Sequence, residues 1–406
     1  MNPKVRKYLN LFLISMGASC IYKLPYLRST YYVAMMEAFH VTNTQIGILM
    51  SSYAITQALS FLPGGWLVDF LPVKYIMPVG LVTTGLLGFL EAGFPGYRTL
   101  ILIQMGYGIT SNLFFWVAMH KATRMLAEEG EQGRMFGLQE GIRGLTGALF
   151  AFTALGLFRI RGEGPEGLRT AIMFYCIILI VIGIVFFFLM DKNEVEGRVT
   201  PLMALRGVVE MLQLKRVWLA AGIVFFGYAL CNGLSYQTPM LVNLFGVRQT
   251  TSAALSLLMH EVVSIAAGPL AGIMADRTGS SVRFLQRVIS ISGLSVLCLL
   301  LIPFRQSLLP LIIGVMLVTS VTVYMMRGTY YSTTGELDIP LTKAGAAMGA
   351  MSLVGNAPDL FAYTLNGRLL DRFPGGTGYR LIFVLMFLYS AGAVLCAARL
   401  RKMLHK

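Results

Sequence analysis

Residues 65–74 read GWLVDFLPVK, a short connection that carries Asp69 and Lys74 between two long apolar segments. Residues 272–279 read GIMADRTG and place Asp276 and Arg277 in the same setting. Asp69 and Asp276 are 207 residues apart, about half the length of the chain. A repeat over this distance predicts two halves with parallel topology.

The apolar segments on either side of these connections indicate a membrane protein. Hydrophobic residues make up 56% of the 406-residue chain and charged residues only 13%. A bilayer core requires about 20 apolar residues per helix. Twelve segments meet this requirement: 8–38, 42–70, 75–94, 97–122, 134–158, 170–190, 214–245, 249–275, 285–303, 307–334, 341–370 and 377–398. We expect an all-α membrane protein with twelve transmembrane helices in two pseudo-symmetric six-helix bundles.

The charged stretch between the halves suggests the domain organisation. We expect an N-terminal bundle at 1–190, a linker at 191–213 and a C-terminal bundle at 214–406. With the N-terminus in the cytoplasm, twenty Lys and Arg lie on the inner side and nine on the outer side. The positive-inside rule therefore places both termini and the linker in the cytoplasm.

The composition also excludes several classes of function. The net charge of +14 arises from basic residues at helix ends, where they meet anionic headgroups, and no basic stripe indicates nucleic-acid binding. The five Cys and four His are scattered singly, so we expect no disulfide framework, metal or cofactor. No catalytic constellation points to an enzyme. We expect a monomeric multi-pass protein, with no cleaved signal peptide despite its charged, apolar N-terminus.

The Gly-x-Leu-x-Asp pattern at 65–69 and its echo at 272–276 resemble the loop signature of the major facilitator superfamily. The resemblance covers the whole chain and implies a secondary transporter with alternating access. In such a loop, Asp69 and Asp276 could pair with Lys74 and Arg277 and act in gating, or they could simply cap helix ends.

Two narrower resemblances follow. The stretch from Arg28 to Met35, with QIGILMSSYAITQALSFLPGGWLVD after it, is similar to the organophosphate:phosphate antiporters. In that family a first-helix Arg binds the substrate phosphate, and Arg28 falls on it; the partner Arg of the seventh helix would fall near Cys231.

GLQEGIRGL and GNAPDLF resemble YihN-like permeases. The fifth helix reads GIRGLTGAL without the Pro of drug:proton antiporters, which makes drug export the minority alternative.

Ionisable residues at membrane depth are site hypotheses because their burial is costly. Arg28 is the first candidate for binding an anion, and snorkelling to the interface is its alternative. Lys23 is the second, since Pro25 could bend the helix and bring the two cations closer. Tyr32, one turn beyond Arg28, adds a hydroxyl donor. Arg327 is late in the tenth helix, where snorkelling is at least as plausible as a function.

The acidic candidates are those that could carry a proton. Glu261 lies near the middle of its segment, and Asp359 lies in the eleventh segment, so either could couple transport to protons or form a structural hydrogen bond. Glu140 and Arg143 are three residues apart, which allows an intrahelical pair or, alternatively, competition for Arg143 by substrate or proton.

A polar and aromatic wall completes the expected site. The seventh helix contributes Tyr228, Asn232, Tyr236 and Gln237, and the fourth helix contributes Asn112 and Trp116. Aromatic residues of this kind also fill bundle cores.

Taken together, these features predict a bacterial inner-membrane transporter whose buried cations bind a small organic anion. We expect proton symport, with exchange for a counter-anion as the first alternative and drug or lipid export as the second.

Overall fold

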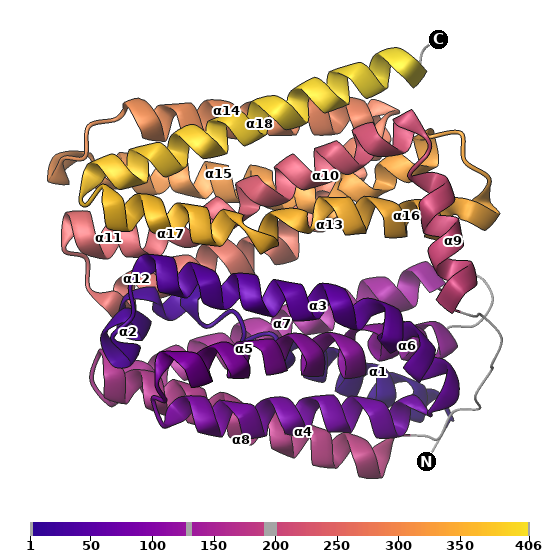
Figure 1. The fold of residues 1–406 in the computed structure, drawn as a ribbon, viewed down its shortest axis with the longest axis horizontal. Helices are drawn as coiled ribbons and strands as arrows, with labels where there is room; N and C mark the ends of the chain where they lie inside the picture. Colours follow the sequence, from indigo (N-terminus) through magenta and orange to yellow (C-terminus); the bar gives the residue numbers. More distant parts are fainter. Residues whose placement is uncertain (1–2, 127–131, 191–200, 405–406) are drawn as a thin grey trace. The chain divides into compact units, whose positions relative to one another are not determined.

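The computed structural model describes residues 3–126, 132–190 and 201–404, and these form helices and connections without a β-strand (Figure 1). The all-α prediction is confirmed. The elements before residue 214 are α1 (Pro3–Ile21), α2 (Arg28–Phe39), α3 (Asn43–Phe70), α4 (Val73–Ala92), α5 (Tyr97–Ser111), the π-helix η1 (Asn112–Trp116), α6 (Val117–Leu126), α7 (Gln132–Ile160), α8 (Pro165–Leu189) and α9 (Pro201–Met211).

The later elements repeat this pattern of long helices with local irregularities. They are α10 (Lys215–Gly233), η2 (Leu234–Tyr236), α11 (Gln237–Phe245), α12 (Gln249–Leu257), the π-helix η3 (Leu258–Val262), α13 (Val263–Thr278), α14 (Ser281–Leu301), η4 (Gln306–Leu308), α15 (Leu309–Thr329), η5 (Tyr330–Glu336), α16 (Leu341–Gly355), η6 (Ala357–Leu360), α17 (Ala362–Arg372) and α18 (Gly376–Leu404).

Nine helices in the described ranges are long and apolar enough to cross a membrane, and they correspond to nine of the twelve predicted segments. The remaining three correspond to α1 with α2, to α3, and to α16 with α17. Two of these are interrupted, at 22–27 and at 356–361. Each interruption contains a proline, Pro25 or Pro358, which cannot donate a backbone hydrogen bond. A proline alone does not break a helix here, because α3, α4 and α13 each contain one without interruption. The sequence predicted the length of these segments and a bend at Pro25, but not the break at 356–361.

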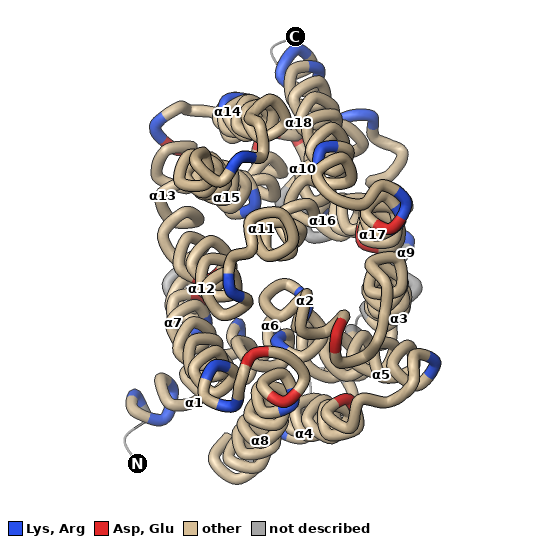
Figure 2. The backbone as a smooth tube through the Cα atoms, turned by 90° about the vertical axis from the view of Figure 1, so that its left-hand side faces the viewer, with Lys and Arg blue, Asp and Glu red and all other residues tan. Residues whose placement is uncertain are grey.

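The chain divides into two compact units. The first comprises residues 1–41, 48–201 and 249–257; the second comprises 42–47, 202–248 and 258–406. In the first unit α4 packs along α8, and α1 packs on α7; in the second, α18 packs on α10 and α14, and α13 on α15 (Figure 1). Figure 2 shows that charged residues occupy only short pieces of the helices in each unit, as expected for helices surrounded by lipid.

In the second unit, the first turn of α3 packs against α17 with almost no space between the backbones. A Cβ added to Gly367 would lie 2.2 Å from the carbonyl oxygen of Asn43, and one added to Gly47 would lie 2.5 Å from that of Tyr363. The Asp371 carboxylate accepts hydrogen bonds from the backbone N–H groups of Asn43 (3.1 Å) and Thr44 (2.8 Å), and from the Asn43 side chain (2.8 Å). The Asp371 carboxylate therefore accepts hydrogen bonds from backbone N–H groups at the start of α3, which have no partner within the helix.

Replacement of Asp371 is expected to destabilise the protein in a pH-dependent manner. Partial burial disfavours the charged carboxylate, but the hydrogen bonds from Thr44 and Asn43 outweigh it and lower the pKa of Asp371. Asp371→Ala should cost about 1 kcal/mol, as for other lost helix caps. A lowered folded-state pKa gives stability above the unfolded-state pKa that is lost as the pH falls through the folded value. Thermal unfolding of both proteins should thus differ at neutral pH and converge in acid; an equal difference at every pH would contradict this assignment.

Candidate functional site

Arg327 is the centre of a polar cluster in the second unit. It lies two residues before the end of α15, and its guanidinium carbon is 5.9 Å from the ring centre of Tyr228. The guanidinium hydrogen-bonds to Cys231 and Tyr330, and Tyr324 is a further electrostatic neighbour. These neighbours are neutral, and within the described residues no carboxylate forms an ion pair with Arg327. Arg327 is nevertheless solvent-exposed, so its positive charge is available to an anion.

A buried network lies beside this cluster, where η2 and η6 interrupt the helices. Asn232 Nδ2 donates to Asp359 Oδ1 at 2.8 Å, and the Tyr363 hydroxyl donates to Asn232 Oδ1 at 2.7 Å. The Tyr236 hydroxyl donates to the Tyr363 carbonyl at 2.9 Å. Asp359 is 3% exposed and is an electrostatic neighbour of Tyr228. The structure thus brings together four predicted residues, Tyr228, Asn232, Tyr236 and Asp359, next to Arg327.

Gln237, the remaining predicted residue of the seventh segment, starts α11 and is 2% exposed. Neither end of its side-chain amide has a hydrogen-bond partner among the described groups. A buried, unsatisfied amide is costly, so Gln237 stays a candidate for binding substrate in another conformation.

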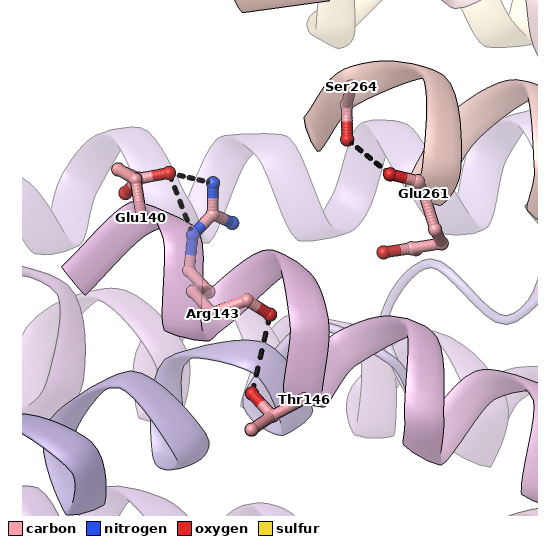
Figure 3. A network of polar contacts seen from close by, with 5 residues as sticks. All are labelled: Glu140, Arg143, Thr146, Glu261 and Ser264. Carbon is pink, nitrogen blue, oxygen red and sulfur yellow. Dashed lines mark hydrogen bonds and ion pairs between the residues drawn. The ribbon is translucent and has the colours of Figure 1, made fainter. Parts of the chain in front are cut away.

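The first unit presents a second cluster of predicted residues around Arg143. Arg143 Nε donates to Glu140 Oε2 at 3.0 Å, and one terminal nitrogen makes a second contact with the same oxygen (Figure 3). Both side chains are partly exposed. Arg143 also acts electrostatically on Tyr22 and His120. The intrahelical pair expected from the spacing of Glu140 and Arg143 is therefore present, and it leaves part of the guanidinium accessible.

Trp116 and Asn112 lie at the two ends of the π-helix η1. The Trp116 ring packs edge-on against Tyr22 at 5.9 Å and His120 at 4.6 Å. Asn112 Nδ2 donates to Ser111 Oγ at 2.9 Å and to the Gly108 carbonyl at 3.1 Å. A π-helical turn adds a residue to the helix and reorients its side chains, and such turns are common at functional sites.

Lys23 lies in the break between α1 and α2, whereas Arg28 and Tyr32 both belong to α2. Lys23 is half-buried in the interruption, whereas Arg28, the first residue of α2, is 2% exposed and Tyr32 is fully buried. At this burial the Arg28 guanidinium is inside the protein rather than at a lipid interface. The three side chains contribute to the interior of the first unit.

Arg28→Ala is expected to lower both substrate affinity and thermal stability. Loss of a buried cation and of the groups it contacts costs about 3 kcal/mol, and Arg28→Lys should restore only part of this loss because Lys lacks the planar guanidinium. The checks are the unfolding temperature and substrate affinity of purified Arg28→Ala and Arg28→Lys. Wild-type affinity in both variants would remove Arg28 from the binding site.

The other predicted coupling and gating residues are spread over the chain. Glu261 lies half-buried in η3, where its backbone carbonyl accepts a hydrogen bond from Ser264 Oγ at 2.8 Å (Figure 3). Asp276 and Arg277 are exposed, and no ion pair joins them in the described part of the chain. Lys74 is half-exposed, while the side chain of Asp69 lies outside the described residues.

Glu336 has a structural role that the sequence did not indicate. Its carboxylate accepts hydrogen bonds from Ser280 Oγ at 2.7 Å and from the backbone of Ser281 and Val282, and so it stabilises the start of α14. His120, Tyr324 and Tyr330 were also missed. A usable signal for the last two was the aromatic sequence YMMRGTYY around Arg327, which surrounds a cation with phenol groups.

The sequence of the chain matches the family model described as Major Facilitator Superfamily over residues 8–363. The chain is 31% identical to the inner membrane protein YihN of Escherichia coli over 396 residues, which is 96% of this chain and 94% of YihN. It is 28% identical to the inner membrane protein YqcE of the same species, over 94% of this chain and 91% of YqcE.

Solved structures share the fold. A bacterial homologue of the human lysosomal transporter Spinster, inward-facing and unoccupied, matches with a TM-score of 0.76 and 14% identity; 99% of this chain and 98% of that chain are covered. The nucleoside transporter NupG, in a mutant form, matches with the same TM-score and identity, over 97% of this chain and 99% of that chain.

Proposed function

Because this chain belongs to the major facilitator superfamily, a family of secondary transporters, we propose that it moves a small organic anion across the bacterial inner membrane by alternating access. The observation that carries the choice of an anion is Arg327, an accessible guanidinium whose hydrogen-bonding neighbours, Cys231 and Tyr330, are neutral. A cation that forms no direct ion pair attracts an anion more strongly than one held in a buried ion pair.

The position of Arg327 also accounts for the arginine that the resemblance to organophosphate:phosphate antiporters leaves without an equivalent on the seventh helix. Cys231 stands near that position, and the Arg327 guanidinium reaches Cys231 from α15. We infer that Arg327 supplies this positive charge, and that Tyr228 and Tyr330 orient its planar face.

Proton symport is our preferred form of coupling. Asp359 is buried, hydrogen-bonded to Asn232, and close to the Arg327 cluster through Tyr228. A carboxyl in this position can bind a proton when the substrate is present and release it afterwards. Glu261 is half-buried and remains the second candidate. Exchange for a counter-anion is the alternative, and it requires no protonation change.

The experiment that tests the proposal is uptake into proteoliposomes. The purified chain should accumulate at least one radiolabelled anion from a panel that contains a monocarboxylate, a dicarboxylate, a sugar acid and a sugar phosphate. Accumulation should rise with an inward pH gradient and collapse when a protonophore is added. Uptake of neutral or cationic compounds, with none of the anions, would reject an anion transporter.

Both termini and the linker should face the cytoplasm in the proposed topology. Single cysteines placed in 159–169 should react with an impermeant maleimide added outside intact cells, whereas those in 201–211 should react only after the membrane is opened. The Cys residues of the chain lie in other segments, so a cysteine-free background is the control. The reverse labelling pattern would contradict this orientation.

A further inference from the structure

Glu91 is a fully buried acid in the first unit, outside the clusters described above. It lies one residue before the end of α4 and is 0% exposed. The Tyr107 hydroxyl of α5, itself fully buried, donates to Glu91 Oε2 at 2.6 Å. Glu91 Oε1 has no hydrogen-bond partner among the described groups. One carboxyl oxygen is therefore satisfied and the other is not.

The groups around Glu91 do not neutralise a negative charge. Tyr107 of α5 and Cys176 of α8 are its titratable neighbours, and Cys20 of α1 lies beyond Cys176. Arg169 of α8 directs its Nε to the Ala92 carbonyl at 3.2 Å and forms its ion pair with Glu166. A buried carboxylate without a cation is costly, and this favours the protonated acid over the charged form.

A glycine keeps this site compact. A Cβ on Gly88 would lie 2.4 Å from Cys176 Sγ and 2.6 Å from a Leu24 methyl group, with the Tyr107 hydroxyl at 3.5 Å. If Glu91 only filled the core, an apolar side chain or one with all its hydrogen bonds made would give a more stable protein, because an unsatisfied buried polar atom costs about 1–3 kcal/mol of folding stability. Such an atom in a folded protein requires an explanation, and reversible protonation is one.

Tyr107 connects this acid to the π-helical turn of the first cluster. The Tyr107 carbonyl accepts a hydrogen bond from Ser111 Oγ at 2.5 Å, and Ser111 Oγ accepts one from Asn112 Nδ2 at 2.9 Å. The Tyr53 hydroxyl lies 3.3 Å from both Ser111 Oγ and Asn112 Nδ2. Tyr107 thus contacts Glu91 with its side chain, and its backbone carbonyl contacts Ser111, the residue that precedes η1.

We propose that Glu91 is a proton-binding site whose occupancy is transmitted through Tyr107 and Ser111 to Asn112 and Trp116 in η1. On release, the O–H bond of the acid breaks, the proton passes to water, and the carboxylate keeps the electron pair. The hydrogen bond from Tyr107 then becomes charge-assisted and shorter, which moves Tyr107 toward α4 and shifts the turn bonded to its carbonyl. The site goes beyond the proposed function, because it lies apart from the coupling candidates Asp359 and Glu261 and its test needs no substrate.

Infrared spectroscopy of the full-length protein in lipid vesicles, titrated with pH and without substrate, tests the proton site. The wild-type protein should show the carbonyl band of a hydrogen-bonded carboxylic acid that decreases as the pH rises. Glu91→Gln should lose this band, whereas the matched control Glu166→Gln, at a residue whose side chain is 70% exposed, should retain it. Asp359→Asn should also retain it, which separates the two buried acids. An identical titration in Glu91→Gln, or a band that never changes with pH, would overturn the proposal.

Trp116 fluorescence tests the connection to η1. Replacing the other two tryptophans by Phe leaves Trp116 as the sole reporter, and His120→Gln removes the titratable ring 4.6 Å away. Emission should change over the same pH range as the infrared band, and this change should be lost in Glu91→Gln. Tyr107→Phe should keep the acid band yet lose the fluorescence change. A fluorescence change that persists in Glu91→Gln would reject the connection. The same infrared titration, run in the reporter background, shows whether that background keeps the folded acid site.

Discussion

Arg327→Ala should bind the transported anion about 30- to 1000-fold more weakly than the wild-type protein, which corresponds to about 2–4 kcal/mol. The guanidinium offers several N–H donors and a charge, and its present partners are the Cys231 thiol and the Tyr330 hydroxyl. An incoming carboxylate or phosphate would form charge-assisted hydrogen bonds that these neutral groups do not provide. Arg327→Lys should be intermediate, because a single ammonium cannot match two oxygens at once.

Affinity and thermal stability of the purified variants separate binding from folding. Arg305→Ala removes an exposed arginine from the segment before α15 and should bind like the wild type. An arginine that only reaches toward the lipid headgroups would behave differently: Lys would replace it fully. Unchanged affinity in Arg327→Ala, with uptake of the anion intact, would remove this residue from the site.

Asp359→Asn should lose accumulation driven by a pH gradient and keep exchange of labelled for unlabelled anion. The amide preserves the shape of the side chain and an oxygen that can accept from Asn232 Nδ2, now 2.8 Å from Asp359 Oδ1, but it cannot bind and release a proton. A gradient of about one pH unit supports up to about tenfold accumulation per coupled proton, because 1.36 kcal/mol corresponds to a factor of ten. This tenfold gain is what the variant should lose.

The measurement is uptake and counterflow in the same proteoliposomes. Asp338→Asn is the matched control, since Asp338 is an exposed aspartate that pairs with Arg216, and exposed pairs contribute little. Loss of both activities together would mean that Asp359 binds substrate or supports the fold rather than carrying the proton. Full gradient-driven uptake in Asp359→Asn would transfer the coupling role to Glu261 or to anion exchange.

The sequence by itself determined the all-α membrane architecture and the family. A bilayer of given thickness requires apolar segments of a set length, and a lipid environment permits only helices or closed barrels. The repeated Gly and Asp around Asp69 and Asp276 then pointed to the superfamily, whose model matches residues 8–363. Local spacing was also sufficient for the contact between Glu140 and Arg143, because residues three apart in a helix are neighbours.

Tertiary structure alone decided which ionisable and polar groups from different helices lie together. Arg327 is close to a helix end, which suggested an interfacial residue, yet packing of α15 beside α10 places its guanidinium against Cys231 and Tyr228. Glu91 is also close to a helix end, and only Tyr107 of α5 and Cys176 of α8 show that it is fully buried. The sequence could not reveal these surroundings because membrane helices are apolar both on the side that faces lipid and on much of the side that faces protein. Periodicity therefore does not reveal which face of a helix meets its neighbours, and the surroundings of a charge depend on helices distant in the chain.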